Sequence, residues 1–262
     1  MEGWDFTWLR ASGRYRIAPL PWSYDDLVRE RIAASPDVLD LGTGGGERLA
    51  SLAPLPPRTV ATESYPPNVP MAARRLAPLG GQVVRTAGAR DNVLHGRADP
   101  RGELPFRDES FHLVIDRNEA YSAHQVSRVL CAGGTFLTEQ SGAGEISAIG
   151  EALELSPPPD DGPAWDLDLA RAQLRAAGLP VVRSGEANHE MEFADVGALA
   201  WYLRAVPWVA PGFSVERHRT QLGRLERKLR AGAPLRIPLR AFWLEALRPP
   251  VAEHRALSPP PR

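Results

Sequence analysis

The sequence predicts an α/β protein, with a doubly wound, mostly parallel sheet and helices on both faces. Short apolar runs alternate with segments of helical period along most of the 262 residues, which is the order that produces βαβ units. One apolar run ends in Asp40 and leads into the glycine-rich stretch 42–46, as a strand does where it turns tightly into a helix. A second acid, Glu63, follows the next predicted strand about twenty residues later, where such folds place a carboxylate that meets ribose hydroxyls.

The glycines of this turn are not spaced as in a dinucleotide-binding loop. Gly42, Gly44 and Gly46 alternate, and Glu47 stands where such a loop needs its third glycine. A helix N-terminus normally holds the pyrophosphate, and a carboxylate at that place would repel it. With Asp40 on the other side, the turn predicts a ligand that carries positive charge and is not a phosphate diester.

In the first half of the chain, the spacing of apolar residues predicts the helices and strands, and prolines and glycines predict where they end. The short helix after the turn ends before Pro54, because proline lacks the N–H group that a helix interior needs. The proline-rich stretch 66–70 predicts a rigid turn, and Gly80 ends the next helix. The predicted elements are a helix at 25–33, a strand at 38–41, a helix at 48–52, a strand at 59–62, a helix at 71–79, strands at 82–86 and 111–115, a helix at 125–130 and a strand at 135–139.

The second half departs from simple alternation. Residues 156–163 are rich in proline and predict an exposed loop between two helices, and Gly178 ends the second of them. Residues 189–193 alternate like a strand. The other predicted elements are helices at 146–155 and 167–177, a strand opening at 181, an apolar and aromatic helix at 196–206, a helix at 215–231 and a last strand at 238–247.

Four motifs carry a resemblance to a known family. VLDLGTGGGE (38–47) and ATE (61–63) resemble the first motif and the ribose-binding strand end of the class I S-adenosylmethionine-dependent methyltransferases. LPFRDESFHLV (104–114) and VLCAGGTF (129–136) are similar to later signatures of the methyltransferase type 11 group, with cysteine and alanine replacing the usual residues before the glycines. Any one motif is weak, but all four in order are specific. The resemblance implies a Rossmann-like, seven-stranded sheet with an antiparallel last strand, and S-adenosylmethionine as cofactor.

The resemblance also implies which residues bind the cofactor. The glycine turn would approach it with backbone, Glu63 would bind the ribose, and Tyr24 would lie near its methionine end. For the acid that binds the adenine amino group, Asp99 is preferred to Asp91 because it lies closer to the LPF motif; an exposed loop acid is the alternative. The implied residues are Asp40, Gly42, Thr43, Gly44, Gly46, Glu63, Asp99, Asn118 and Tyr24.

The segment after the strand at 111–115 carries the candidate catalytic groups. Ligands of open α/β sheets bind outside the carboxyl ends of the strands, and residues 116–124 leave one of those ends. Methyl transfer is an in-line displacement, so positioning supplies much of the acceleration, and a base is needed only when the acceptor must lose a proton. Glu119 or His124 is the candidate base, and Tyr121 is the candidate to orient the acceptor. Helix capping and an exposed helix face are the alternative interpretation.

Two regions flank the part that bears the motifs. Residues 1–35 are dense in aromatic side chains, which predicts a cap packed on the core or a lid over the site. Residues 36–250 form the methyltransferase-like domain, with an insertion at about 188–235, and residues 251–262 form a flexible tail. In the family, such insertions shape the acceptor pocket. The aromatic candidates for its wall are Trp201, Tyr202, Trp208 and Phe213. The first two could equally belong to the core.

Composition narrows the class of function. The net charge is −1 and the sequence isoelectric point about 6.6, so no global basic field attracts nucleic acid. The arginines at 217–230 are interleaved with glutamates, which favours a solvated face. A single cysteine fits a cytoplasmic protein, and no apolar run resembles a signal peptide or a membrane span. No metal site is predicted.

The sequence therefore predicts an enzyme that transfers a methyl group from S-adenosylmethionine to a small-molecule acceptor, such as an aromatic compound or a specialised metabolite. An RNA base methyltransferase and a non-catalytic S-adenosylmethionine-binding protein are the alternatives. The first requires a local arginine-rich face, and the second requires only the cofactor site.

Overall fold

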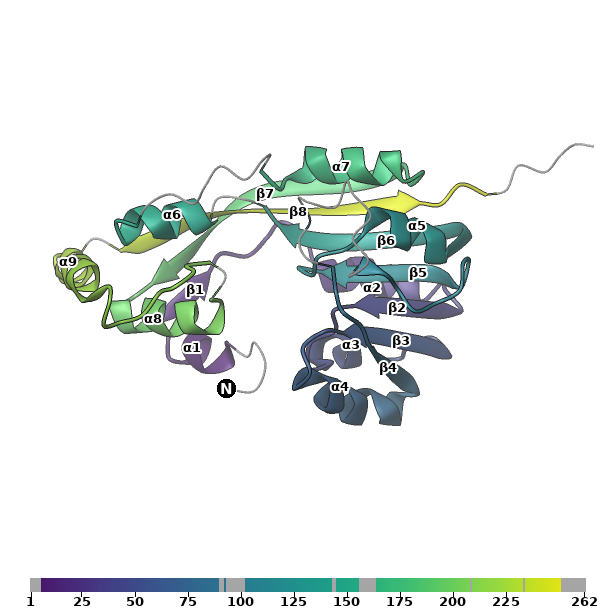
Figure 1. Cartoon of the computed structure of the whole chain (residues 1–262), viewed down its shortest axis with the longest axis horizontal. Helices are drawn as coiled ribbons and strands as arrows, with labels where there is room; N and C mark the ends of the chain where they lie inside the picture. Colours follow the sequence, from purple (N-terminus) through teal and green to yellow (C-terminus); the bar gives the residue numbers. More distant parts are fainter. Residues whose placement is uncertain are drawn as a thin grey trace, which may run out of the picture.

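The structure is a computed structural model, and it describes residues 6–89, 92, 102–142, 145–155, 164–207, 209–232 and 234–250. Its strands are β1 (Tyr15–Ile17), β2 (Asp37–Leu41), β3 (Arg58–Glu63), β4 (Gly81–Arg85), β5 (Phe111–Arg117), β6 (Leu130–Ser141), β7 (Val181–Phe193) and β8 (Leu235–Leu247). They form one sheet in the order β1-β7-β8-β6-β5-β2-β3-β4 (Figure 1). The five neighbouring strands β4, β3, β2, β5 and β6 are parallel to one another, and β8 runs antiparallel to β6. The predicted mostly parallel sheet with a reversed last strand is confirmed.

The sheet has one strand more than the seven predicted. The additional strand, β1, pairs antiparallel with the end of β7 through Tyr15↔Phe193 and Ile17↔Met191. It is three residues long. A segment of this length is too short to show a strand period in the sequence.

Helices cover both faces of the parallel strands. The helices of the described residues are α1 (Thr7–Ala11), α2 (Tyr24–Ile32), α3 (Glu47–Ser51), α4 (Asn68–Leu76), α5 (Ala123–Val129), α6 (Glu145–Ala152), α7 (Leu167–Ala176), α8 (Val196–Ala205), α9 (Arg219–Arg230) and the 3-10 helix η1 (Ala77–Leu79). Of these, α2, α3, α4, α5 and α7 pack on the parallel strands. Successive strand residues point to opposite faces. Leu39 of β2 thus packs in one core with α5 and α7, and its neighbour Val38 packs in another with α2, α3 and α4. Among the described residues, no helix is long and apolar enough to cross a membrane.

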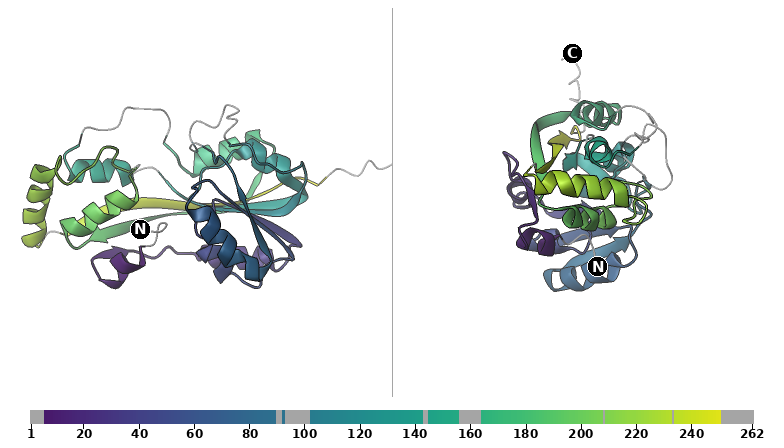
Figure 2. Two further views of the ribbon diagram at one scale, coloured as in Figure 1. Left: turned by 60° about the horizontal axis from the view of Figure 1, so that its bottom comes forward. Right: turned by 90° about the vertical axis from the view of Figure 1, so that its left-hand side faces the viewer.

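β7 and β8 extend beyond the parallel strands and build a second hydrophobic core. The pairing of β6 with β8 ends at Ser141↔Ala241, whereas β7 and β8 stay paired as far as Phe193↔Leu235. Around this extension lie β1, α1, α6, α8 and α9, which share a core of their own with the ends of β7 and β8. We call this part the distal lobe and the remainder the sheet lobe (Figures 1 and 2). The carboxyl ends of the parallel strands face the distal lobe.

The aromatic N-terminal segment packs on the distal lobe. The ring of Tyr15 stacks on that of Tyr202 at a centroid distance of 5.9 Å, and Arg14 pairs with Asp195 at the start of α8. Residues 18–23 then lead from β1 to α2 in the sheet lobe (Figure 2). The N-terminal segment therefore connects the two lobes.

One predicted turn is wrong, and one predicted helix start is shifted. The rigid turn at 66–70 does not form as predicted, because α4 already begins at Asn68. Pro70 is the third residue of this helix, where an N–H group has no partner within the helix, so proline is tolerated. α9 begins at Arg219 instead of 215, after turns that end at His218.

Candidate functional site

Acidic side chains gather at the carboxyl ends of three neighbouring parallel strands. Asp40 lies on β2, Glu63 on β3 and Asp116 on β5, and Glu119 follows β5. Because β2 is paired with both β3 and β5, these strand ends are adjacent. This is the edge where ligands bind in open α/β sheets.

The glycine turn between β2 and α3 is held against β3. Gly42 and Gly44 have positive φ angles of 64° and 62°, which favour glycine. The N–H of Thr43 donates to the carbonyl of Thr62 at 2.9 Å, and the N–H of Gly42 donates to the Thr62 hydroxyl at 3.2 Å. A Cβ atom added at Gly44 would meet no atom within 4 Å. The turn therefore presents open backbone at Gly44.

Gly46 has a packing role at the start of α3, and its predicted cofactor contact stays a prediction. It is the N-cap of α3 and has a φ of 79°. A Cβ atom at this position would lie 3.3 Å from the Cα of Ala72 and 3.3 Å from the Cγ of Leu76. The missing side chain thus lets α3 approach α4.

Gly46→Ala is expected to lower the free energy of unfolding by about 1–3 kcal/mol, because the new methyl group overlaps α4 and the backbone is left-handed. Thermal unfolding measures this loss. Gly133→Ala is the matched control, since Gly133 has a φ of 77° and open space where its Cβ would lie. Equal losses in the two variants would contradict the packing role.

The structure weakens the argument from Glu47 about the charge of the ligand. Its carboxylate pairs with Arg75 of α4, which also donates to the carbonyl of Gly45. The Glu47 side chain is 61% exposed. Because Arg75 neutralises Glu47, the predicted repulsion of a pyrophosphate loses its basis, and the preference for a cation rests on the other acids.

Glu63 is a buried carboxylate without a cationic partner among the described residues. It is 3% exposed, and its Oε1 accepts from the N–H of Tyr65 at 2.7 Å. Burial raises the pKa of Glu63, and hydrogen bonds from nearby backbone N–H groups oppose the rise. The residue lies at the end of β3, beside the glycine turn, as a ribose-binding carboxylate would. This role stays a prediction.

Asp40 and Glu119 repel each other and Glu63. Burial raises the pKa of Asp40 to about 7; a hydrogen bond from Thr43 and the charge of Arg48 oppose the rise, and the charge of Glu63 adds to it. Burial also raises the pKa of Glu119 to about 7, and the charges of Glu63 and Asp40 add to the rise. A bound cation would relieve this repulsion. Among the described residues, no group of three histidine, cysteine or acidic side chains is arranged to hold a metal ion. The repulsion among these acids therefore favours a cationic ligand.

Glu119→Gln is expected to stabilise the ligand-free protein at about pH 8 but not at about pH 5. The folded protein keeps the Glu119 proton up to a pKa of about 7, whereas an ordinary glutamate loses it near 4.5. The stability linked to this proton is present at acidic pH and is lost as the pH rises through about 7. Removing the charge should raise the free energy of unfolding by about 1–3 kcal/mol at high pH. Thermal unfolding across this range tests it, and a difference independent of pH would contradict it.

A pocket lies between the glycine turn and the segment after β5. Its empty volume, open solvent included, is about 390 Å³, and Gly42 and Glu119 are among its lining residues. Glu119 lies against the turn, since a Cβ atom at Gly42 would be 2.5 Å from the Glu119 Cγ. The cofactor implied by the motifs fits the group of acids and the open backbone at Gly44. Its approach to Gly42 requires the Glu119 side chain to move.

Of the three catalytic candidates, Glu119 and Tyr121 line this pocket and His124 does not. Tyr121 also lines the pocket but is 2% exposed, and its ring packs on Phe136 at 4.9 Å. Burial and the charge of Asp116 raise its pKa well above the usual range. Tyr121 thus belongs to the core and also lines the pocket, and the acceptor-orienting role predicted for it stays a prediction. His124 is exposed on α5 and does not line the pocket. The role of base stays a prediction for Glu119.

A hydrogen-bonded network behind the pocket was not predicted. Asp116 is fully buried, and its Oδ1 accepts from the Thr138 hydroxyl at 2.8 Å and from the Gln140 amide at 2.5 Å. The Gln140 amide nitrogen is also 3.1 Å from the carbonyl of Glu119, and its oxygen accepts from Asn92. The network fixes the segment that carries Glu119. No local pattern marks Gln140, because these partners are 21 to 48 residues away in sequence.

Tyr24 and Asn118 have other partners than the cofactor. Tyr24 is 4% exposed, and its hydroxyl donates to the carbonyl of Asp116 at 2.7 Å, inside the core between α2 and the sheet. Its predicted contact with the methionine end of the cofactor stays a prediction. Asn118 is exposed, with a φ of 56°, and its side-chain oxygen accepts from Ser141 at 3.2 Å. Asn118 does not line the pocket, and its cofactor contact stays a prediction.

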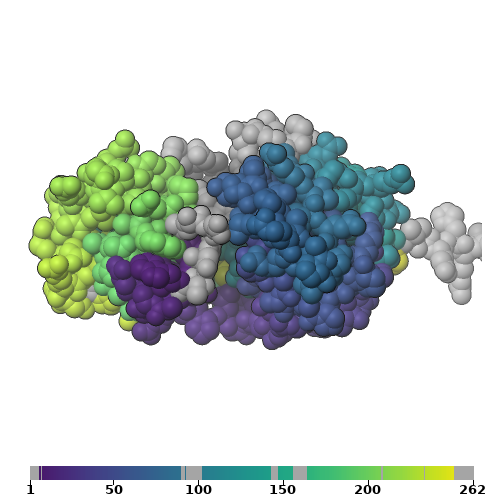
Figure 3. Space-filling model, turned by 90° about the horizontal axis from the view of Figure 1, so that it is seen from below, coloured from purple at the N-terminus to yellow at the C-terminus, as the bar shows by residue number. Residues whose placement is uncertain are grey.

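The aromatic candidates for the acceptor pocket lie in the distal lobe. Tyr202 is 8% exposed in that core, which favours the alternative that it is structural. The ring of Trp201 is half-buried and lies 5.8 Å from that of Trp8 on α1, and Trp8 is 55% exposed. Phe213 stacks on His218 at 5.2 Å. In Figure 3, α1 (dark purple) lies at the surface of the distal lobe. The predicted residues outside the described part of the chain are Asp91, Asp99 and Trp208.

The chain is similar in structure to solved proteins over most of its length. A proposed methyltransferase from Bacillus halodurans superposes with a TM-score of 0.59 at 20% identity, over 87% of this chain and 100% of that one. A proposed sarcosine dimethylglycine methyltransferase from Galdieria sulphuraria gives a TM-score of 0.51 at 15% identity, over 86% and 85% of the two chains. The fold is that of the class I methyltransferases.

The class I methyltransferase fold does not by itself determine the reaction. The cyclase SpnF matches this chain with a TM-score of 0.50 at 17% identity, over 86% of this chain and 80% of that one. One fold commonly hosts several activities, so function must be argued from the site. No family model and no curated protein sequence matches the chain.

Proposed function

We propose that this protein is an S-adenosylmethionine-dependent methyltransferase that acts on a small, partly aromatic acceptor. The observation that carries the proposal is the group of carboxylates around the glycine turn, Asp40, Glu63 and Glu119, none of which forms an ion pair with a described arginine or lysine. Like charges held together in this way favour a cationic ligand. S-adenosylmethionine carries both a sulfonium and an ammonium group, and the fold supports the same cofactor.

Three residues around the glycine turn would take part in methyl transfer. When bound, the cofactor supplies a methyl group on a positively charged sulfur, and an acceptor atom displaces that sulfur in line. Glu63 would bind the ribose, and the open backbone at Gly44 would lie against the cofactor. Glu119, once moved away from Gly42, could take a proton from the acceptor. Its pKa of about 7 suits a base at neutral pH.

The proposed acceptor class rests on the aromatic residues of the distal lobe. Trp8 and Trp201 form a partly exposed aromatic surface, with rings 5.8 Å apart. A flat acceptor can stack on such a surface, and a pocket lined by aromatic side chains binds apolar molecules well. The near-neutral charge of the chain supports a small acceptor over a nucleic acid.

Transfer of a labelled methyl group tests the proposal. The protein is incubated with S-adenosylmethionine carrying a radioactive methyl group and a panel of phenols and aromatic amines, with transfer RNA as a separate arm. Label should enter a small aromatic acceptor, and Glu119→Gln should slow this transfer by about a hundredfold for an acceptor that loses a proton. Label in RNA alone would favour the RNA methyltransferase. Cofactor binding without transfer to any acceptor would favour the non-catalytic alternative.

A further inference from the structure

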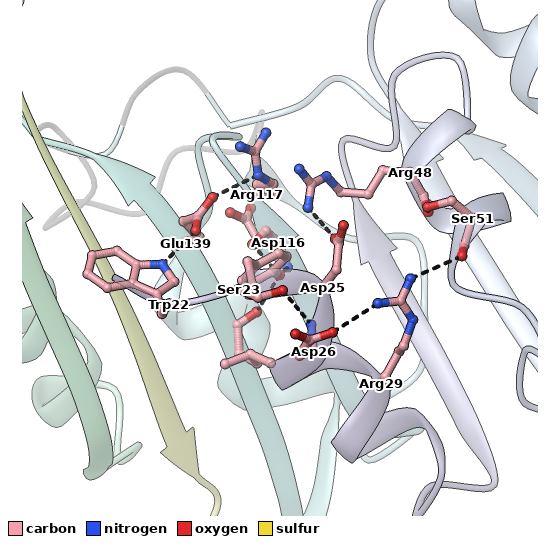
Figure 4. Close-up of polar contacts among 12 residues, drawn as sticks. Trp22, Ser23, Asp25, Asp26, Arg29, Arg48, Ser51, Asp116, Arg117 and Glu139 are labelled. Atoms are coloured by element: carbon pink, nitrogen blue, oxygen red, sulfur yellow. Dashed lines mark hydrogen bonds and ion pairs between the residues drawn. The ribbon is translucent and has the colours of Figure 1, made fainter. Parts of the chain in front are cut away.

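Two arginines lie side by side at the edge of the sheet lobe that faces the distal lobe. Arg117 ends β5, and Arg48 is the second residue of α3, directly after the glycine turn. Each side chain is 38% exposed. In Figure 4 their guanidinium groups lie next to each other, above Asp25 and Glu139. Burial and the neighbouring charge of Arg117 lower the pKa of Arg48, in agreement with this closeness.

Each guanidinium group is held by an ion pair with a carboxylate. Arg117 donates through Nε to Glu139 at 2.8 Å, and the second oxygen of Glu139 accepts from the indole N–H of Trp22 at 2.8 Å. Arg48 pairs with Asp25 in the first turn of α2, and its guanidinium lies 5.8 Å from the centre of the Tyr24 ring. The N-terminal segment thus holds both arginines, while the Nη groups of Arg117 have no partner among the described residues.

The arginine pair lies beside the acids of the glycine turn. The acids Asp40, Glu63 and Glu119 lie at the ends of β2, β3 and β5, and the arginine pair lies beside them, close enough for Arg48 to act on the charge of Asp40. A planar guanidinium group binds a carboxylate through two parallel hydrogen bonds. Two such groups held in place lose little conformational entropy when they bind it.

We propose that Arg48 and Arg117 form a carboxylate-binding site next to the glycine turn, with Trp22 and Glu139 as residues that position Arg117. The inference rests on the proposed function and deepens it. The carboxylate can come from the amino-acid part of the cofactor or from an acidic acceptor. Either source requires the same two guanidinium groups.

Titration calorimetry with two pairs of probes tests the site and separates the sources. S-adenosylhomocysteine carries the amino-acid carboxylate, and methylthioadenosine lacks it. Benzoate carries a carboxylate, and benzamide does not; these two are titrated into both free and S-adenosylhomocysteine-saturated protein. Arg48→Met and Arg117→Met should weaken binding of at least one carboxylate probe by about tenfold and leave its uncharged partner within about twofold. Loss confined to S-adenosylhomocysteine identifies the cofactor as the source, and loss confined to benzoate identifies the acceptor.

The control is Arg29→Met, which removes an arginine of α2 that pairs with Asp26 and donates to the carbonyl of Ser51 (Figure 4). This variant should bind every probe as the wild type does. Trp22→Phe keeps an aromatic side chain, although a smaller one, and removes the N–H donor to Glu139, so it should cause a smaller loss, of about threefold, for the same carboxylate probe.

The proposal is overturned if Arg48→Met and Arg117→Met, folded as judged by thermal unfolding, bind both carboxylate probes as tightly as the wild type. It is also overturned if the wild type does not distinguish either carboxylate probe from its uncharged partner. A wild type that binds neither S-adenosylhomocysteine nor methylthioadenosine would refute the proposed function. In that case the benzoate titration on the free protein still decides whether the arginine pair binds a carboxylate.

Discussion

Gly44→Val is expected to abolish binding of S-adenosylmethionine while the protein stays folded. The position has a φ of 62°, and a Cβ atom there would have no other atom within 4 Å, so the cost to the fold is confined to backbone strain of about 1–2 kcal/mol. The branched side chain would fill the space where the backbone is open toward a ligand. Affinity should fall by more than about a hundredfold, which calorimetry measures.

The chain offers a matched control for this strain. Gly80, the C-cap of η1, has a φ of 77° and equally open space around its missing Cβ, but it lies between α4 and β4. Gly80→Val should lower the melting temperature in the same way and leave the affinity unchanged. If Gly44→Val bound the cofactor like the wild type, the placement of the cofactor at this turn would be wrong.

Glu63→Ala is expected to weaken cofactor binding by about 1.5–3 kcal/mol, which is roughly 10- to 150-fold, because charge-assisted hydrogen bonds to the ribose are lost. The alanine variant also loses the hydrogen bond from the N–H of Tyr65. Glu63→Gln keeps an acceptor for that N–H and therefore isolates the effect of the charge. Calorimetry with S-adenosylmethionine measures both variants.

Glu47→Gln is the control for Glu63. Glu47 is an acid of the same region, but it is exposed and paired with Arg75, so its replacement should leave the affinity within about twofold. An effect of Glu63→Ala on turnover alone, with unchanged affinity, would contradict the ribose-binding role. An equal loss in Glu47→Gln would indicate that general negative charge, and not the position of Glu63, determines binding.

The sheet lobe could be predicted because its signals are local. Apolar runs, the glycine turn and helix breakers mark β2 to β6 and the helices between them, and the predicted strand after residue 181 is the start of β7. Local patterns also predict the strand at 189–193, the helix at 196–206 and the strand at 238–247, which lie in β7, α8 and β8. The arrangement of these elements as a distal lobe could not be predicted in the same way. It exists because β7 and β8 continue their pairing beyond β6, and pairing between distant segments leaves no pattern within either one.

The same difference between local order and long-range packing separates the site residues that could be predicted from those that could not. The turn at Gly42 and Gly44 and the strand-end acids Asp40 and Glu63 depend on order within short segments, and the structure brings them to one edge of the sheet. The surroundings of Tyr24 depend on packing: α2 lies on the sheet, so the Tyr24 hydroxyl donates to the carbonyl of Asp116 in β5.

Long-range contacts also decide the polar groups that the sequence did not reveal. The hydrogen-bond partners of Gln140, and those of Arg48 and Arg117, come from segments far away in the chain. The hydrogen bond between Trp22 and Glu139 also joins distant segments. A sequence motif records which residues follow one another. It does not record which ones the fold brings together.

The most direct test of the cofactor site is titration calorimetry of the purified protein with S-adenosylmethionine, S-adenosylhomocysteine and NAD. The acids around the glycine turn and the open backbone at Gly44 predict binding of the first two, with dissociation constants on the order of micromolar, and no binding of NAD. Binding of NAD, or binding of none of the three, would contradict the proposed cofactor.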